Sequence, residues 1–470
     1  MRITCSLLMA IVLCPVVVHA SGTVYEAGDP GLGFNLISWA NFGADGEDVW
    51  TAAVQDAWDN GFSHVSLCPV RYFNTSTGEI YDTHAKGPEL SHVAAGLARA
   101  KSLGMTATIN PFVEPDGFTM WRGQWNPSGA TASTFWTDYT AYISAVANLA
   151  QTGGADRMTI GTELRAIMRN SAHNTAVTGV IGAADAAYSG QIGYAANHDN
   201  YNNANLTASV WENPAVDFLG VDAYFQLASN SQADASGTHP DTSFISTVQN
   251  KWNNLLDNSL LPFASARKNG TGMPLVLTEH GLIPWNRTTV QPYSENPYWS
   301  GQPLDQDEQI NGYDAMLRAL DGRSADDSLL EVDLWQWGMP GAHDSLWFLN
   351  PRATDNEPGS KYDETLGIPA ARFLSRFATS ALLAGDANRD GQVSLADLSA
   401  LAANWGASGN EGIWAMGDFD VDGSVSLADL STLAANWGAG TSAAQVPEPA
   451  SLALLCLGGA MMVRRRRGRR

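Results

Sequence analysis

Short apolar runs of strand length alternate with helix-like segments through residues 22–378, and this alternation limits the fold more than any other feature of the chain. The strand-like runs cover residues 33–39, 64–70, 105–112, 157–164, 216–225, 274–281 and 331–338. Segments with helical apolar spacing lie between them, such as VWTAAVQDAWDNG, ELSHVAAGLARAKSLG and FWTDYTAYISAVANLAQTGG. Such alternation is typical of a parallel α/β architecture, and no GxGxxG follows any of the runs, which argues against a dinucleotide-binding fold.

Seven strand-like runs are one short of a closed barrel. If the weaker run LTASV (206–210) is the fifth strand, the count reaches eight. The sequence therefore predicts a (β/α)8 TIM barrel over residues 22–378. Because barrel enzymes place their reacting groups at the C-terminal ends of the strands, polar residues that end apolar strands are the candidate site residues.

Two glutamates stand at such positions. Glu163 ends RMTIGTEL on the fourth predicted strand, and Glu279 ends PLVLTEHG on the seventh. Strands four and seven of a barrel face each other across its mouth. Cleavage of a glycosidic bond with retention requires two carboxyl groups about 5–5.5 Å apart, one as nucleophile and one as acid/base. The pair predicts this chemistry, although either glutamate alone could equally be a loop-facing or salt-bridged carboxylate.

Several segments together resemble glycoside hydrolase family 113, the β-mannanase-type branch of the large retaining (β/α)8 clan. They are SLCPVRYFNTSTGEIY, MWRGQWNP, TIGTEL and VLTEHG, which occur in the order and approximate spacing of that family. The resemblance implies that Glu163 is the acid/base, that Glu279 is the nucleophile and that the substrate is β-1,4-mannan or a related β-glycan. Thr162 stands where the clan more often has an asparagine that touches the sugar 2-hydroxyl, as the family 113 pattern allows, and the resemblance makes it a candidate substrate-binding residue.

Two polar residues at strand ends are further candidates for the site. Tyr224 ends the sixth predicted strand, where a clan tyrosine hydrogen-bonds the nucleophile and keeps it ionised. Asn110 ends the third predicted strand and is a candidate sugar contact. The alternatives are an amphipathic tyrosine at the barrel rim and a turn-forming asparagine before Pro111.

Aromatic residues supply candidate sugar platforms, and 16 tryptophans exceed ordinary usage. Trp335 and Trp337 are expected to share one face of the last strand, because side chains alternate with a period of two. One of them is predicted to form the sugar platform. Trp121 and the adjacent Arg122 are further candidates for substrate binding. Most of the other tryptophans are expected to be packing residues.

Residues 381–440 contain a repeat with a period of 32: GDANRDGQVSLADLSALAANWG and GDFDVDGSVSLADLSTLAANWG. Each copy has oxygen-bearing residues at positions 1, 3, 5, 9 and 12 of a calcium loop, a residue at position 7 that offers its carbonyl, and glycine at position 6. The predicted calcium ligands are Asp386, Asn388, Asp390, Gln392, Ser394 and Asp397, then Asp418, Asp420, Asp422, Ser424, Ser426 and Asp429.

Two such loops, each followed by one helix, resemble the dockerin type I repeat, which implies a small all-α module with structural calcium. The resemblance implies docking onto a cohesin-like or other surface partner, and a spacer within the chain is an equally open role. An acidic, solvated linker is the remaining alternative. It does not explain why glycine recurs in register.

The two ends of the chain resemble targeting segments. Residues 1–20 have one arginine, a short apolar run and a Val-His-Ala ending, which predicts a signal peptide. Residues 446–470 contain Pro-Glu-Pro, a short apolar stretch and an arginine cluster, and resemble the PEP-CTERM sorting signal. That resemblance implies recognition by an exosortase and release at the cell surface. Membrane anchors are the alternative at both ends, but both apolar runs are short for a bilayer span.

Charge excludes one class of partner. The net charge is −22, and removal of the two terminal segments, which carry seven arginines and one glutamate, makes it −28. A nucleic-acid partner is therefore not expected, because phosphates would be repelled. Cys68 is the one cysteine between the terminal segments, so the catalytic region cannot form an internal disulfide.

Two functions fit these observations. The first is an exported retaining glycosidase that acts on polysaccharide at the cell periphery. The second is a non-catalytic surface protein that binds glycans or acts as a scaffold assembled through the calcium repeats. Both glutamates are intact, which favours the enzyme.

Overall fold

The computed structural model describes residues 30–321, 323, 328–339, 346–350, 363–408 and 413–440. The predicted signal peptide (1–20) and sorting segment (446–470) lie outside these residues. Within the described part of the chain, no helix is both long enough and apolar enough to span a bilayer.

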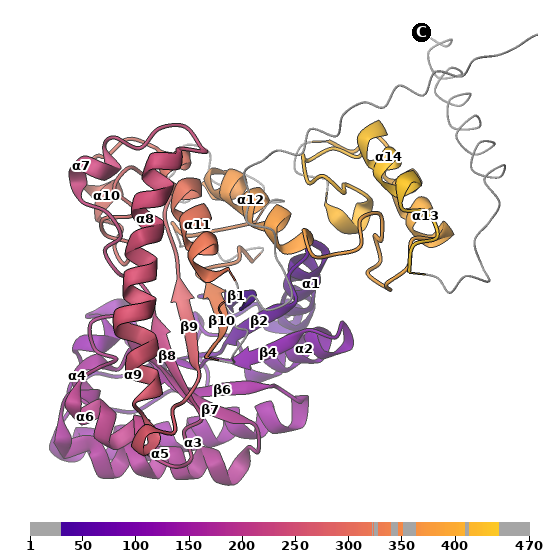
Figure 1. Ribbon diagram of the computed structural model, residues 1–470. Helices are drawn as coiled ribbons and strands as arrows, with labels where there is room; N and C mark the ends of the chain where they lie inside the picture. Colours follow the sequence, from indigo (N-terminus) through magenta and orange to yellow (C-terminus); the bar gives the residue numbers. More distant parts are fainter. Residues whose placement is uncertain are drawn as a thin grey trace, which may run out of the picture.

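Eight parallel strands close into a barrel surrounded by helices (Figure 1), as the sequence predicts. Neighbouring strands follow chain order, and the first pairs with the last, so the sheet has no open edge. The barrel strands are β1 (Gly31–Ile37), β2 (His64–Cys68), β4 (Thr106–Ile109), β6 (Arg157–Thr162), β7 (Gln191–Asn197), β8 (Phe218–Asp222), β9 (Leu275–His280) and β10 (Leu329–Leu334). A separate parallel pair, β3 (Val70–Phe73) and β5 (Phe112–Pro115), continues from the ends of β2 and β4.

The prediction for the fifth strand is wrong. Residues 206–210 belong to a helical segment, in which α6 (Ala204–Leu206) runs into a π-helical turn at Thr207–Trp211. The fifth barrel strand is β7, with the sequence QIGYAAN. Its small residues give a weak apolar pattern. At Gly193 a small residue is required, because a Cβ there would lie 2.3 Å from the Phe218 ring of the neighbouring strand.

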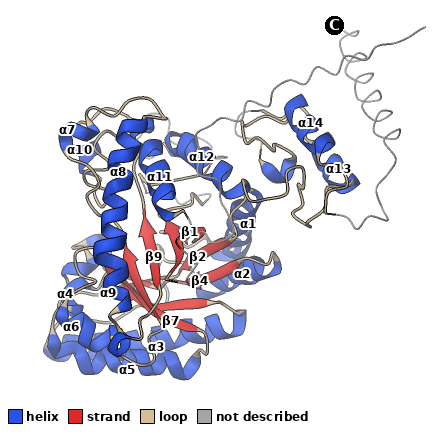
Figure 2. Ribbon diagram, viewed as in Figure 1, coloured by secondary structure: helices blue, strands red, loops and turns tan. Residues whose placement is uncertain are grey.

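The helices cover the outside of the barrel, and Figure 2 shows them in blue around the red strands. Each buries one apolar face, as Trp50, Val54 and Ala57 do on the first helix. The longer barrel helices are α1 (Gly46–Asp59), α2 (Leu90–Ser102), α3 (Gly129–Gly153), α5 (Asn174–Ala187), α8 (Thr242–Leu255), α11 (Gln306–Leu320) and α12 (Ile368–Thr379). The short ones are α4 (Arg165–Met168), α7 (Asn230–Ala233), α9 (Leu261–Ser265) and α10 (Asn296–Trp299).

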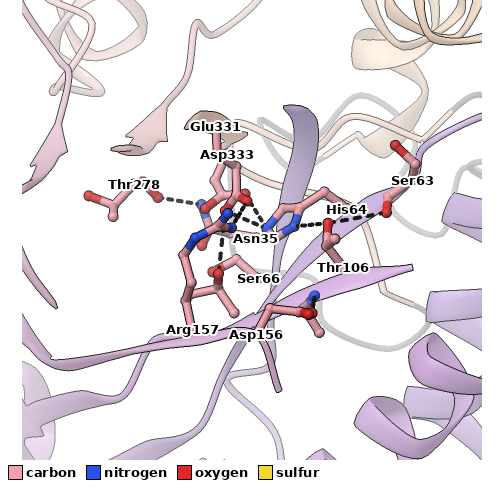
Figure 3. A network of polar contacts seen from close by, with 12 residues as sticks. Asn35, Ser63, His64, Ser66, Thr106, Asp156, Arg157, Thr278, Glu331 and Asp333 are labelled. Atoms are coloured by element: carbon pink, nitrogen blue, oxygen red, sulfur yellow. Dashed lines mark hydrogen bonds and ion pairs between the residues drawn. The ribbon is translucent and has the colours of Figure 1, made fainter. Parts of the chain in front are cut away.

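A buried ionic network fills the barrel interior at the N-terminal ends of the strands (Figure 3). His64 Nε2 lies 2.7 Å from Glu331 Oε1 and 3.1 Å from Asp333 Oδ1, and Arg157 also pairs with Glu331. Burial alone would lower the pKa of His64, but the two carboxylates raise it to about 9. Burial raises the pKa of Asp333 to about 6. Two cations thus balance two carboxyl groups, which is how buried charges are tolerated.

The repeat segment forms a small separate core after the barrel. Its two helices, α13 (Leu395–Ala403) and α14 (Leu427–Ala435), begin in the same way. Ser394 and Ser426 are the N-caps, and Asp397 and Asp429 complete capping boxes with them. Each half therefore reproduces the same loop–helix unit, in agreement with the repeat in the sequence.

Candidate active site

The end of β6 places Glu163 at the C-terminal mouth of the barrel. The register between β6 and β7 shifts between Thr159 and Thr162, and Glu163 itself has a φ of 54°. Such irregularities next to a strand end re-aim a side chain. Gly161 (φ 142°) is required there, because a Cβ would lie 2.1 Å from the Tyr139 hydroxyl oxygen.

Three polar side chains hold the Glu163 carboxyl group. Arg122 Nη2 lies 2.8 Å from Oε2, the Asn197 amide donates a hydrogen bond to Oε1, and Trp121 donates a third hydrogen bond. Burial nevertheless raises the pKa of Glu163, against the lowering effect of Arg122. The 13% exposure of this side chain leaves it reachable from the cleft. A carboxyl group of raised pKa that a substrate can reach is suited to donate a proton.

Arg122 lies inside the protein between two carboxylates and is not an open sugar-binding residue. It is 8% exposed, and it pairs with Glu114 as well as with Glu163. Burial raises the pKa of Glu114, and the Arg122 charge opposes that rise. The predicted substrate-binding role of Arg122 therefore becomes, in this structure, contact with the Glu163 carboxyl group.

Glu279 lies in β9 and is 3% exposed. The Tyr224 hydroxyl donates a hydrogen bond of 3.0 Å to Glu279 Oε2, which is the contact expected from the clan resemblance. Oε1 has no hydrogen-bond partner among the described residues. Burial, followed by the negative charges of Asp222 and Glu163, raises the pKa of Glu279 well above its usual range, while Arg122 and Tyr224 oppose the rise.

Asp222 adds a third carboxyl group that the sequence did not reveal. It ends β8, is fully buried, and lies opposite Glu279 in the strand pairing. Thr278 donates a hydrogen bond of 2.7 Å to its Oδ1. Burial and the Glu163 charge raise its pKa well above the usual range. Asp222 and Glu163 carry the two negative charges that destabilise the ionised form of Glu279, and protonation of both would remove them. Among the three carboxyl groups, only that of Glu279 accepts a hydrogen bond from the Tyr224 hydroxyl.

Asn110 and Thr162 lie beneath the glutamates and form a buried support. The hydroxyl groups of Thr159 and Thr162 donate to Asn110 Oδ1 over 2.6 and 2.7 Å. Asn110 and Thr162 are at most 1% exposed. This contact ties the end of β4 to the end of β6, next to Glu163. The proposed sugar contacts of Asn110 and Thr162 remain predictions.

The prediction that Trp335 and Trp337 share one face is wrong. The last strand ends at Leu334, so period-two alternation does not extend to these residues. Trp335 joins a cluster at the barrel mouth and stacks on Phe112 with ring centroids 5.7 Å apart. Trp337 is fully buried against Phe34 in the barrel core and cannot be a sugar platform.

The cluster around Trp335 contains aromatic residues that the sequence did not single out. Trp39 and Trp347 are half-buried and pack against it, and it also includes Tyr224, the hydrogen-bond donor to Glu279. The predicted platform candidate Trp121 is also half-buried and hydrogen-bonds Glu163. The cluster therefore gathers aromatic side chains from the segments that follow β1, β4, β8 and β10.

A separate cavity of about 540 Å³ opens on the same rim, in the loops after β7, β8 and β9. His198 follows the Glu163 partner Asn197 directly, and its ring stacks on Tyr293 with centroids 5.6 Å apart. Tyr293 is 55% exposed. Neutral amide and hydroxyl groups supply most of the remaining lining: Gln226, Ser229, Asn230, Val290 and Gln291. Neither Glu163 nor Glu279 lines this cavity, so it is a hollow beside the two glutamates and does not contain them.

Three of the predicted calcium ligands lie close together in the second calcium-type loop. In the second loop, the carboxylates of Asp418, Asp420 and Asp422 offer oxygens within 4.8 Å of one another. Burial raises the pKa of Asp418 to about 7, with the Asp429 charge as a further cause. A hard divalent cation would relieve this crowding of negative charge, so the donor set fits calcium.

Comparison with known proteins identifies the barrel. The model of Glycoside Hydrolase Family 113 matches residues 44–343, which is more than half of the chain. The chain belongs to glycoside hydrolase family 113. A second model, the PEP-CTERM protein-sorting motif, matches residues 445–467, which confirms the resemblance of the C-terminal segment. No curated protein matches the chain.

Solved structures of family 113 share the fold at low sequence identity. The β-mannanase from Alicyclobacillus acidocaldarius is 19% identical, with a TM-score of 0.56 over 76% of this chain and 100% of that one. A β-1,4-mannanase of the family is 16% identical, with a TM-score of 0.55 over 75% and 99%. A complex of a β-1,4-mannanase is 14% identical, with a TM-score of 0.52 over 74% and 98%.

Proposed function

We propose that this glycoside hydrolase cleaves β-1,4-mannan or a closely related β-glycan with retention, using Glu279 as nucleophile and Glu163 as acid/base. The observation that carries the proposal is the different support of the two carboxyl groups. Tyr224 donates a hydrogen bond to Glu279, which favours its ionised form. Glu163 is buried with a raised pKa and is still reachable.

The reaction follows from these two environments. Ionised Glu279 attacks the anomeric carbon and forms a glycosyl-enzyme, while Glu163 passes its proton to the leaving oxygen. Glu163, now ionised beside Arg122, takes a proton from water, and the resulting hydroxide equivalent releases the sugar with Glu279 restored. Arg122 stabilises the ionised form of Glu163 that the second step needs, so it is a positioning residue.

The substrate class has its own support. Similar family 113 structures are described as β-mannanases or β-1,4-mannanases. The cavity beside His198 and Tyr293 is lined by neutral hydrogen-bonding groups, which suit the hydroxyl groups of an uncharged sugar. The cavity adjoins Asn197, whose side-chain amide donates a hydrogen bond to the proposed proton donor Glu163. We therefore assign the cavity to the part of the polysaccharide that leaves in the first step. An acidic polysaccharide would find no cation among its lining residues.

The deciding experiment incubates the purified protein with mannan, glucomannan, xylan and mixed-linkage glucan and measures reducing ends. Release from mannan or glucomannan is expected. Glu279→Ala should abolish turnover, and azide should then restore it with inverted configuration. Glu163→Ala should spare substrates whose leaving group needs no proton. Wild-type activity of both variants on the polysaccharide would contradict the roles.

The remaining parts of the chain extend this proposal. We infer that residues 381–440 bind two structural calcium ions through the twelve predicted ligands and resemble a dockerin in this respect. A cohesin-like or other surface partner is a proposed consequence. The sorting motif at 445–467 supports export and processing by an exosortase-type enzyme. The predicted signal peptide would start the same route and place the enzyme where polymer too large for import is found.

A further inference from the structure

The C-terminal module touches the barrel through the same position of both calcium-type loops. Arg389 and Val421 are each the fourth loop residue, 32 positions apart. Both have left-handed backbone conformations, with φ of 57° and 50°. Figure 1 shows the module, in yellow and orange, beside α1 and α12 of the barrel. The pseudo-repeat thus presents two equivalent loop tips to one neighbour.

Arg389 contacts the C-terminal end of α1. Its Nη1 donates to the carbonyl oxygens of Trp58 at 2.9 Å and Phe62 at 3.3 Å. Its guanidinium carbon lies 3.4 Å from the centre of the Trp58 ring. The Trp58 carbonyl oxygen also accepts a hydrogen bond from the Gly61 N–H, and the partial negative charge at a helix C-terminus makes a cation favourable there. The contact thus combines a helix cap with a cation–π interaction.

This cap leads directly into the barrel core. Phe62 is fully buried and packs edge-on against Phe34 and Trp337, with ring centroids 4.6 and 5.6 Å away. The turn that Arg389 holds therefore fixes the entry of β2 into the core. A loosened Arg389 contact would release a segment on which barrel packing depends.

Val421 supplies the second contact. Its side chain is 4% exposed in the core of the module. Its carbonyl oxygen accepts a hydrogen bond of 3.1 Å from Arg376 Nε on α12, the last barrel helix. The two loop tips therefore bridge the first and last helices of the barrel domain.

We propose that this module is a clamp on its own catalytic barrel, so that both unfold as one cooperative unit. Calcium bound in the loops would set the backbone of the two tips and thereby stabilise the barrel. The calcium part of this inference rests on the ion binding proposed above, whereas the docking part rests on the contacts alone. The face used for the clamp is then closed to any other protein partner.

The test compares the full chain with Arg389→Ala and with Lys251→Ala, which removes an exposed cation on α8 away from the module. Calorimetry with calcium or a chelator should give one transition in the parent, which calcium raises by roughly 2–4 °C. Arg389→Ala should separate a barrel transition that no longer responds to calcium, while Lys251→Ala should behave like the parent.

A second readout separates docking from damage to the loop. Trp58→Leu removes the ring that lies against the Arg389 guanidinium, from the barrel side and without changing the module. Hydrogen exchange of amides 58–62 should become faster in both interface variants and stay slow in the control. A single calcium-raised transition in Arg389→Ala, or unchanged exchange in both variants, would overturn the clamp. If calcium titration of the full chain detects no binding, the proposed effect of calcium is wrong. The hydrogen-exchange comparison alone then tests whether the module is docked on the barrel.

Discussion

The Tyr224 hydroxyl is the group whose removal tests the site most sharply. It donates the hydrogen bond of 3.0 Å to Glu279 Oε2, and Oε1 has no partner among the described residues. A buried hydrogen bond to a charged group contributes about 1.5–3 kcal/mol. Tyr224→Phe should therefore lower kcat/KM roughly 10- to 150-fold, since about 1.4 kcal/mol corresponds to a factor of ten.

The pH profile of kcat/KM should also shift in Tyr224→Phe, in a direction that the structure predicts. The Tyr224 hydrogen bond lowers the pKa of Glu279, against burial and the charges of Asp222 and Glu163. Without it that pKa rises, and because the nucleophile must be ionised, the acidic limb of the kcat/KM profile should move to higher pH.

The assay is a pH–rate profile of the parent, Tyr224→Phe and a matched control. Tyr188→Phe is the control, because it also removes a buried hydroxyl bond, 2.8 Å long, to the Ala155 carbonyl oxygen. It should cost comparable stability without moving either limb of the profile. An acidic limb that stays in place in Tyr224→Phe would refute the assignment of Glu279 as the group that Tyr224 keeps ionised.

Three further predictions address other parts of the molecule. The alkaline limb of kcat/KM should disappear in Glu163→Ala with an activated aryl glycoside, because loss of the Glu163 proton at high pH causes that limb; a retained limb would assign it elsewhere. Tyr293→Ala should lower kcat/KM on long oligosaccharides about 2- to 10-fold, as expected for loss of one aromatic contact, and leave kcat/KM on aryl glycosides unchanged. The control Trp299→Ala, in the same loop, should leave kcat/KM on both kinds of substrate unchanged. The pKa of His64 rises from 6.5 to about 9 on folding. Its protonation therefore stabilises the folded state by about 3 kcal/mol at most, an effect that is complete below pH 6.5 and is lost as the pH rises through 9. Urea unfolding should show this fall in the free energy of unfolding in the parent and not in His64→Gln.

The position of the two catalytic candidates could be predicted from the sequence because it depends on local pattern. Apolar strands that end in a polar residue identify Glu163 and Glu279, and barrel topology then brings such ends together. The fifth strand could not be found in this way. Strand β7 carries a glycine where it crowds Phe218 and two alanines further on, so its apolar signal is weaker than that of the helical run after it.

The partners of the glutamates depend on contacts between residues far apart in the chain. Asn197 was not predicted as a site residue, because the strand that carries it was not predicted. Asp222 has no distinguishing feature in the sequence, and only the strand pairing places it opposite Glu279. Arg122 was expected to bind substrate, yet it is enclosed between Glu114 and Glu163. Trp337 was expected at the mouth, but the strand ends before it and the ring turns into the core.

The sequence by itself determined the barrel class, the two glutamates, the repeat and the sorting motif, because each is encoded by spacing within a short stretch of chain. The tertiary structure alone decided which carboxyl groups are buried together and which hydrogen bonds each receives. It also decided that the fourth residue of each repeated loop faces the barrel. These features depend on burial and on interactions between charged groups from distant segments of the chain. The shift of a pKa is set by those surroundings and not by the residue type.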